Sequence, residues 1–225
     1  MLKVYQICFQ EQQKEFCDYT PYMNADCDEY FENSVIRKLI EEGEHKDAEY
    51  FGVVSYKLRH KIGTVQKNWS IDNIKNHSTN TFHPDAFEFE LNAHKPDAMS
   101  FQRHASHDTV TFANNFHPNF SKYFDKILSE LSLTRTNKSY KDIFYCNFFV
   151  AKAEIYEHYV KSLLTPAMDV MKSMPELWGN SRYPHPLPQN ISDRLSIDHY
   201  PYHSFICERL FTYYADKEKL NCRHY

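Results

Sequence analysis

The side chains best suited to chemistry lie near the C-terminus, in the segment YPYHSFICERLF at positions 200–211. His203 and the adjacent pair Glu208 and Arg209 stand among residues that are mostly aromatic or aliphatic. Because ionised groups are costly to bury unless they are paired or used, these residues belong either to a structural ion network or to a site. A partly buried Glu208 can act as a general base on a hydroxyl group. The alternative is a Glu208–Arg209 pair that holds the last helix in place.

Two further places in the sequence could carry chemistry. Asp26 and Asp28 stand two residues apart, and two such carboxylates can share a divalent cation that also binds a diphosphate. The alternative is that they cap a helix N-terminus. Asn147 is a lone amide in the apolar run IFYCNFFV, where it needs a partner from a neighbouring backbone segment or from a bound sugar.

Lys57 and Arg59 belong to the basic segment YKLRHK that follows an apolar run. If that run is a central strand, these cations lie where open α/β sheets bind ligands and can neutralise a diphosphate. The alternative is a solvated basic loop. The segment 94–108 contains histidines and aspartates at metal-like spacing, namely His94, Asp97, His104, His107 and Asp108. No clear helix or strand positions them, which favours a polar loop over a metal-dependent hydrolase.

Composition narrows the classes of function. The chain has 225 residues, a length typical of one domain, and a net charge of −4, which argues against a general nucleic-acid binder. Its four glycines are too far apart for a P-loop or a dinucleotide fingerprint. The six cysteines form no C-x-x-C pair and are expected to be free thiols in a reducing cytosol. We expect neither a secretory signal nor a transmembrane helix, and a peripheral membrane contact is compatible with the sequence.

The apolar pattern predicts the elements that must position these residues. We expect strands at 2–9, 50–56 and 143–150, with a further short one near 97–101. We expect helices at 30–40, 120–131, 154–174 and 204–215, with Pro166 kinking or dividing the third. The order strand, helix, strand at the start predicts a parallel pair. Residues 63–118 and 179–203 are expected to be largely irregular.

Several segments together resemble bacterial glycosyltransferase-like proteins of capsular and surface-polysaccharide loci. They are YTPYMNAD, DAEYFGVVSYKLRHK, YCNFFVAKAEIYEHYVKSLLTPAM and YHSFICERLFTYY. The resemblance covers most of the sequence. It implies an α/β, GT-A-like fold, which is a Rossmann-like mixed sheet flanked by helices in a single domain. It also implies transfer of a sugar from a nucleotide-sugar donor to a glycan acceptor, with Mn²⁺ or Mg²⁺ as a candidate cofactor and a cytoplasmic location. The sequence differs from the group in its short length, in SYK where the group has HYRR, and in having no clear D-x-D motif after a strand near its middle.

The resemblance also suggests site roles. It places the nucleotide near Tyr22 and Asn24, beside the candidate metal ligands Asp26 and Asp28. Tyr56, Lys57 and Arg59 would face the diphosphate or the sugar. Glu208, His203 and Asn147 would line the junction of donor and acceptor, with Glu208 in the catalytic role. The competing hypothesis is a glycan-binding or assembly protein on the same fold that has no catalytic activity.

Overall fold

The computed structural model describes residues 1–24, 26, 28–63, 82–101, 109–135, 140, 142–144 and 146–225. Within them, six strands form one mixed sheet in the order β2-β1-β3-β5-β4-β6. The strands are β1 Leu2–Cys8, β2 Thr20–Met23, β3 Tyr50–Ser55, β4 Ala98–Ser100, β5 Phe149–Lys152 and β6 Cys222–His224. β1 pairs in parallel with β2 and β3, and β5 runs antiparallel to β3 and β4. The predicted α/β class and the parallel pairing of the first two expected strands are therefore confirmed.

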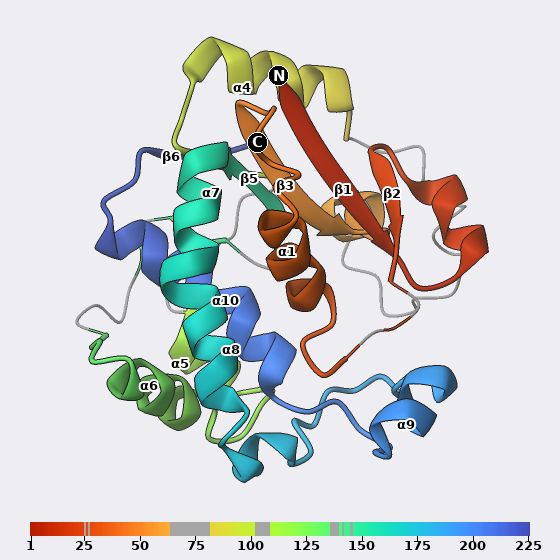
Figure 1. The fold of residues 1–225 in the computed structure, drawn as a ribbon, viewed down its shortest axis with the longest axis vertical. Coiled ribbons are helices and arrows are strands. Elements are labelled where there is room, and N and C mark those ends of the chain that lie inside the picture. The colour runs from red at the N-terminus through yellow and green to blue at the C-terminus, as the bar shows by residue number, and fades with distance from the viewer. Residues whose placement is uncertain are drawn as a thin grey trace.

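Helices cover both faces of this sheet (Figure 1). The α-helices are α1 Glu32–Glu41, α2 Leu58–Gly63, α4 Pro84–His94, α5 Thr109–Ala113, α6 Phe120–Glu130, α7 Ala153–Tyr159, α8 Thr165–Met171, α9 Gln189–Leu195 and α10 His203–Lys217. Short 3-10 helices lie at η1 Glu11–Phe16 and η3 Pro175–Trp178, and a π-helical turn, η2, spans Val160–Leu164 between α7 and α8.

The two faces of the sheet take alternate side chains from each strand. In β3, Phe51 and Val53 join the larger core, which also contains residues of α1, α6, α7, α8 and α10. Tyr50 and Val54 point to the other face, where they pack with residues of α2 and α4. This two-residue period is what a strand covered on both sides requires, and it explains the unbroken apolar run of β3.

Gly52 lies where β5 approaches β3 most closely. A Cβ atom at this position would stand 2.8 Å from Val150 Cγ1 and 2.9 Å from the Phe149 carbonyl oxygen. Glycine is therefore required here for close packing of two neighbouring strands.

The structure corrects several sequence-based boundaries. β5 begins at Phe149, so the expected strand over 143–150 is wrong in its first part, and Cys146 and Asn147 adopt positive φ angles just before it. The segment at 20–23, where no strand was predicted, is the edge strand β2. Helices α4 and α9 lie in regions that were expected to be irregular. In β2, α4 and α9 the local apolar signal is weak, and pairing or packing with distant segments decides the conformation.

The long helix expected at 154–174 runs as α7, η2 and α8 in one helical path, with a π-helical turn before its proline rather than a break. Pro166 lies in the first turn of α8, and η2 directly precedes it. Because proline has no N–H, the π-helical turn accommodates the missing hydrogen bond without ending the helical path.

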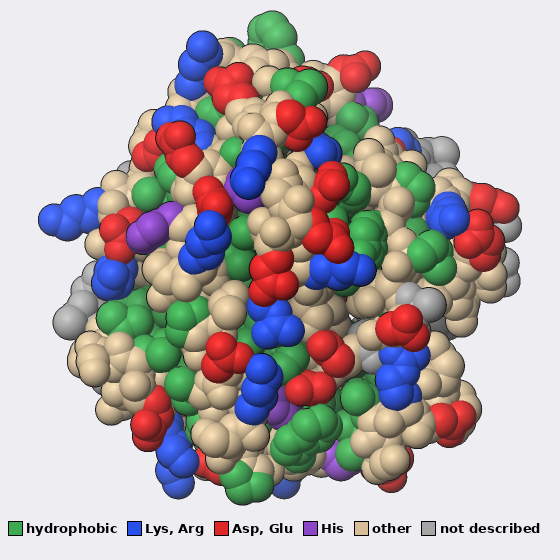
Figure 2. Space-filling model, viewed as in Figure 1, with side chains coloured by type: hydrophobic (Ala, Val, Ile, Leu, Met, Phe, Trp, Pro, Cys, Tyr) green, Lys and Arg blue, Asp and Glu red, His purple; other side chains and the backbone are tan. Residues whose placement is uncertain are grey.

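Charges of both signs are interspersed on the face of the molecule drawn in Figure 2. Oppositely charged side chains also form exposed pairs, such as Lys161 with Glu157 at 2.6 Å and Lys172 with Asp169 at 2.7 Å. Among the helices that the structure describes, we find none whose length and apolar character would let it cross a bilayer.

Candidate functional site

A cavity of about 480 Å³ opens at the carboxyl ends of β1 and β3. We call it the edge pocket. It is lined by Phe9, Gln10, Gln13, Phe31, Glu32, Ser55, Tyr56, Lys57, Tyr183, His185, Pro186, Pro188, Asn190, Ile191, Tyr200, Ser204, Phe205 and Glu208. The backbone leaves β1 toward β2 on one side and later returns to β3 on the other. This reversal of strand order is where open α/β sheets bind ligands, and the volume suits a small molecule.

Aromatic rings form much of the pocket wall. Phe31 stacks on Tyr200 with ring centroids 5.5 Å apart and an interplanar angle of 26°, and Tyr183 meets Tyr200 edge-on at 5.0 Å. Phe31 has φ 53° and ψ −119°, a conformation that non-glycine residues rarely adopt. The side-chain amide of Asn24 donates a hydrogen bond of 3.4 Å to the Phe31 carbonyl and so helps to hold this backbone. Such local strain is typical of positions that serve a site.

Glu208 reaches the pocket from α10. Its side chain is 16% exposed, and Arg209 Nη1 lies 3.6 Å from its Oε2 atom. Arg209 itself is buried, donates to the Phe205 carbonyl at 2.6 Å, and lies over the Phe120 ring at 4.8 Å. Glu208 therefore both pairs with Arg209 and faces the pocket. Arg209 is held in place by its contacts within the helix packing.

Of the predicted cations, Lys57 lines the pocket, while Arg59 is bound elsewhere. Lys57 Nζ lies 5.5 Å from the centroid of the Tyr56 ring, which also lines the pocket. The Arg59 Nε atom donates to both carboxylate oxygens of Asp18 at 2.7 Å, and the Asp18 side chain is only 5% exposed. This salt bridge fastens α2 to the segment that leads into β2.

His203 does not line the edge pocket. Its ring lies between Tyr30, with centroids 5.3 Å apart, and Trp178, at 4.9 Å. The side chain is fully buried, and neither ring nitrogen has a hydrogen-bond partner among the described residues. This burial lowers the pKa of His203 to about 4. The imidazole is therefore neutral near pH 7 and packs as part of the core.

Asn147 also lies outside the pocket. It is buried, and its Nδ2 atom donates at 3.1 Å to Asn33 Oδ1, while Asn33 donates onward to the Tyr30 carbonyl at 3.0 Å. Its φ of 57° is one that asparagine tolerates better than most residues. Its amide thus has a side-chain partner that the sequence alone did not suggest.

The predicted nucleotide and metal residues around β2 lie beside the pocket rather than in its lining. Tyr22 packs edge-on against Tyr5 at 6.1 Å. Asp28 accepts hydrogen bonds from the Tyr30 N–H at 2.9 Å and from the Ser34 hydroxyl at 2.5 Å, and the second bond ties the segment before α1 to the first turn of that helix. Asp26 is fully exposed and lies 3.9 Å from Arg194 of α9.

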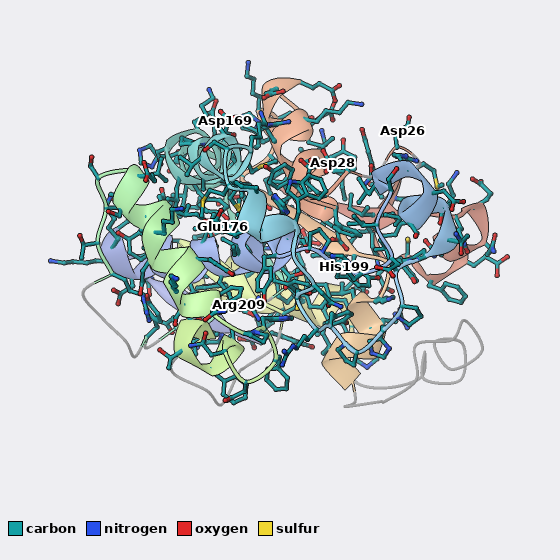
Figure 3. All side chains as sticks on the ribbon, turned by 90° about the horizontal axis from the view of Figure 1, so that it is seen from below. Asp26, Asp28, Asp169, Glu176, His199 and Arg209 are labelled. Carbon is teal, nitrogen blue, oxygen red and sulfur yellow. The ribbon has the colours of Figure 1, made fainter. Side chains whose placement is uncertain are left out.

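Figure 3 places Asp26 beside α9 and apart from Asp28, so the structure does not bring these two candidate metal ligands together. In the part of the sequence that the structure describes, we find no group of three or more His, Cys, Asp or Glu side chains arranged to hold a metal ion.

The histidine-rich segment gives little further support for a metal centre. His104, His107 and Asp108 lie outside the described residues. His94 pairs with Glu90 at 3.2 Å, and Asp97 pairs with Lys152 at 2.8 Å. The two upstream members of this motif thus have local partners.

Part of the pocket could be predicted from the sequence. Tyr56, Lys57 and Glu208 are predicted site residues, and the structure brings these three together with residues from α1, α9 and the loop at 183–188. Glu32, Phe31 and Tyr200 were not identified. The rule that ligands bind at the carboxyl ends of parallel strands could have pointed to Phe9 and Gln10 after β1.

A scan against protein-family models and searches among curated proteins and solved structures give no match to this sequence.

Proposed function

We propose that this protein is a glycosyltransferase that moves a sugar from a nucleotide-sugar donor to a glycan acceptor, with the edge pocket as its site. The observation that carries the proposal is the position of Glu208. This carboxylate enters a pocket of small-molecule size at the reversal of strand order in an α/β sheet. A GT-A-like arrangement of the sheet and the family resemblance belong to the same proposal.

In the proposed reaction, Glu208 accepts the proton of an acceptor hydroxyl. The hydroxyl oxygen forms a bond to the anomeric carbon of the donor sugar, the bond from that carbon to the diphosphate breaks, and a nucleoside diphosphate leaves. Phe31 and Tyr200 supply flat apolar surfaces for a base or sugar ring. Lys57 supplies positive charge for the diphosphate. Because Asp26 and Asp28 have separate partners in this structure, no step is assigned to a metal.

The first test is a thermal-shift screen with uridine, guanosine and cytidine diphosphate sugars, with and without Mn²⁺. A ligand at about 100 times its dissociation constant stabilises by roughly 2.7 kcal/mol, which raises the Tm of a protein of this size by about 5 to 10 °C. The absence of a shift with every donor contradicts the proposal.

The second test compares the two pocket carboxylates. Glu208→Gln should abolish transfer, keep the donor-induced shift in Tm, and cost less than about 1 kcal/mol of stability, because Arg209 keeps its bond to the Phe205 carbonyl. Glu32→Gln is the matched control, since Glu32 lines the same pocket at the start of α1. A large loss of stability with retained transfer in Glu208→Gln would assign Glu208 to structure instead.

A second candidate is a glycan-binding or assembly protein without catalytic activity. The salt bridge between Arg59 and Asp18 favours this second function. Of the two cations predicted to bind the diphosphate, Lys57 lines the pocket and Arg59 does not. A diphosphate is better held by several cations or by a metal ion. Binding of free oligosaccharide without any response to nucleotide sugars would favour this second function.

A further inference from the structure

The sulfur atoms of Cys8 and Cys17 lie 3.4 Å apart beside the edge pocket. Cys8 is the last residue of β1 and is fully buried, whereas Cys17 follows η1 directly and is partly exposed. Each thiol also lies within donor range of a backbone carbonyl, that of Gln6 for Cys8 and that of Gln13 for Cys17, both at 3.7 Å. Both are free thiols in this structure.

From this geometry we propose that Cys8 and Cys17 form a redox-active dithiol, which a hydroperoxide converts to an intramolecular disulfide next to the pocket wall. The two sulfurs need to approach from 3.4 Å to about 2.05 Å, a small movement for a pair joined by a short surface segment. Transient, redox-sensing disulfides of this kind are the ones that a reducing compartment allows.

The chemistry is a two-electron oxidation of the thiols. One thiol attacks the hydroperoxide, the O–O bond breaks, an alcohol or water leaves, and a sulfenic acid forms. The second thiol then attacks that sulfur, the S–S bond forms, the S–O bond breaks, and water leaves. The product is the same whichever sulfur reacts first. The hydrogen bond between the thiols lowers the pKa of Cys8 and raises the pKa of Cys17, so Cys8 is the member of the pair that holds the thiolate.

The proposed link would brace one wall of the pocket. Gln10 and Gln13 line the pocket within the segment that the disulfide would close. Gln13 Oε1 accepts hydrogen bonds from the backbone N–H groups of Phe9 at 2.6 Å and Gln10 at 3.1 Å, so η1 is already tied to the end of β1. Oxidation would make this connection covalent.

The test treats purified, reduced protein with hydrogen peroxide and maps its thiols by mass spectrometry in a Cys27→Ser background. That background is needed because Cys17 and Cys27 lie in one tryptic peptide, 15–37, while Cys8 lies in the peptide 4–14. The expected result is a loss of two hydrogen atoms, a link between these two peptides, and a rise in Tm of about 5 °C that dithiothreitol reverses. Cys17→Ser should remove the link and the rise, and Cys222→Ser, the matched control with similar partial burial, should retain both.

A second measurement does not depend on oxidation. Phenylarsine oxide, which captures two neighbouring thiols, should bind the Cys27→Ser protein at one equivalent and should not bind once Cys17→Ser is added. Formation of sulfinic acid on Cys17 without the 8–17 link would overturn the proposal. So would full alkylation of both cysteines after peroxide treatment.

Discussion

Replacing His203 by leucine should change the acid sensitivity of the fold and leave the edge pocket working. His203 is fully buried between Tyr30 and Trp178, and its ring nitrogens make no hydrogen bond within the described part of the protein. Its pKa of about 4 lies below the ordinary value of 6.5 because burial disfavours the charged imidazolium. Leucine has a similar volume and cannot bind a proton.

The magnitude follows from linkage between protonation and folding. Between pH 6.5 and pH 4 the unfolded protein binds a proton at this position and the folded protein does not. The contribution of His203 to the free energy of unfolding is therefore fully present above pH 6.5 and is lost as the pH falls toward 4. At about 1.36 kcal/mol per pKa unit, the loss from pH 8 to pH 5 is about 2 kcal/mol for one such histidine. His117 also has a pKa lowered by burial to about 4. From pH 8 to pH 5 the two histidines together should therefore lower the free energy of unfolding of the wild type by about 4 kcal/mol.

The assay is urea denaturation followed by far-ultraviolet circular dichroism at several pH values from 8 to 5. Tryptophan fluorescence is unsuitable, because Trp178 contacts the substituted residue. His203→Leu should lose about 2 kcal/mol less than the wild type over this range, while its stability at pH 8 stays within about 1 kcal/mol of the wild type. Carboxylates common to both proteins cancel in the comparison. If the free energy of unfolding falls equally with pH in the two proteins, the reasoning is refuted. A loss of donor-induced stabilisation in the variant would place His203 in the site.

Three other substitutions test the framework around the pocket. Gly52→Ala should cost about 2 kcal/mol in urea denaturation, because its Cβ would meet Val150 Cγ1 at 2.8 Å; an unchanged midpoint would contradict this packing. Arg59→Met should lower the free energy of unfolding by about 2 kcal/mol, because it removes the partner of the buried Asp18 carboxylate. This figure is smaller than for a fully buried pair, since Arg59 is 35% exposed. The variant should keep donor binding in a thermal-shift titration, and a selective loss of binding would return Arg59 to the site. Tyr200→Ala should weaken donor binding at least about tenfold in the same titration, and unchanged affinity would exclude ring stacking at this position.

The sequence determined the elements whose apolar residues repeat with a clear period. The unbroken run at 50–56 and the helical spacing over 120–131 correspond to β3 and α6. The helix at 30–40 ends near Gly43, which adopts φ +80° as a helix-terminating glycine often does. These signals are local, because the period of the apolar residues depends on whether the segment is a strand or a helix and not on which elements pack against it.

The tertiary structure alone decided which polar residues share a site. Glu208 and Lys57 are far apart in the sequence and meet in the edge pocket because β3 ends beside the start of α10. Arg59 stands two residues beyond Lys57 and is bound to Asp18 instead. His203, at the start of the same helix as Glu208, points into the core between two aromatic rings. The surroundings of each side chain depend on how elements from distant parts of the sequence pack together. The spacing of residues along the sequence does not predict that packing.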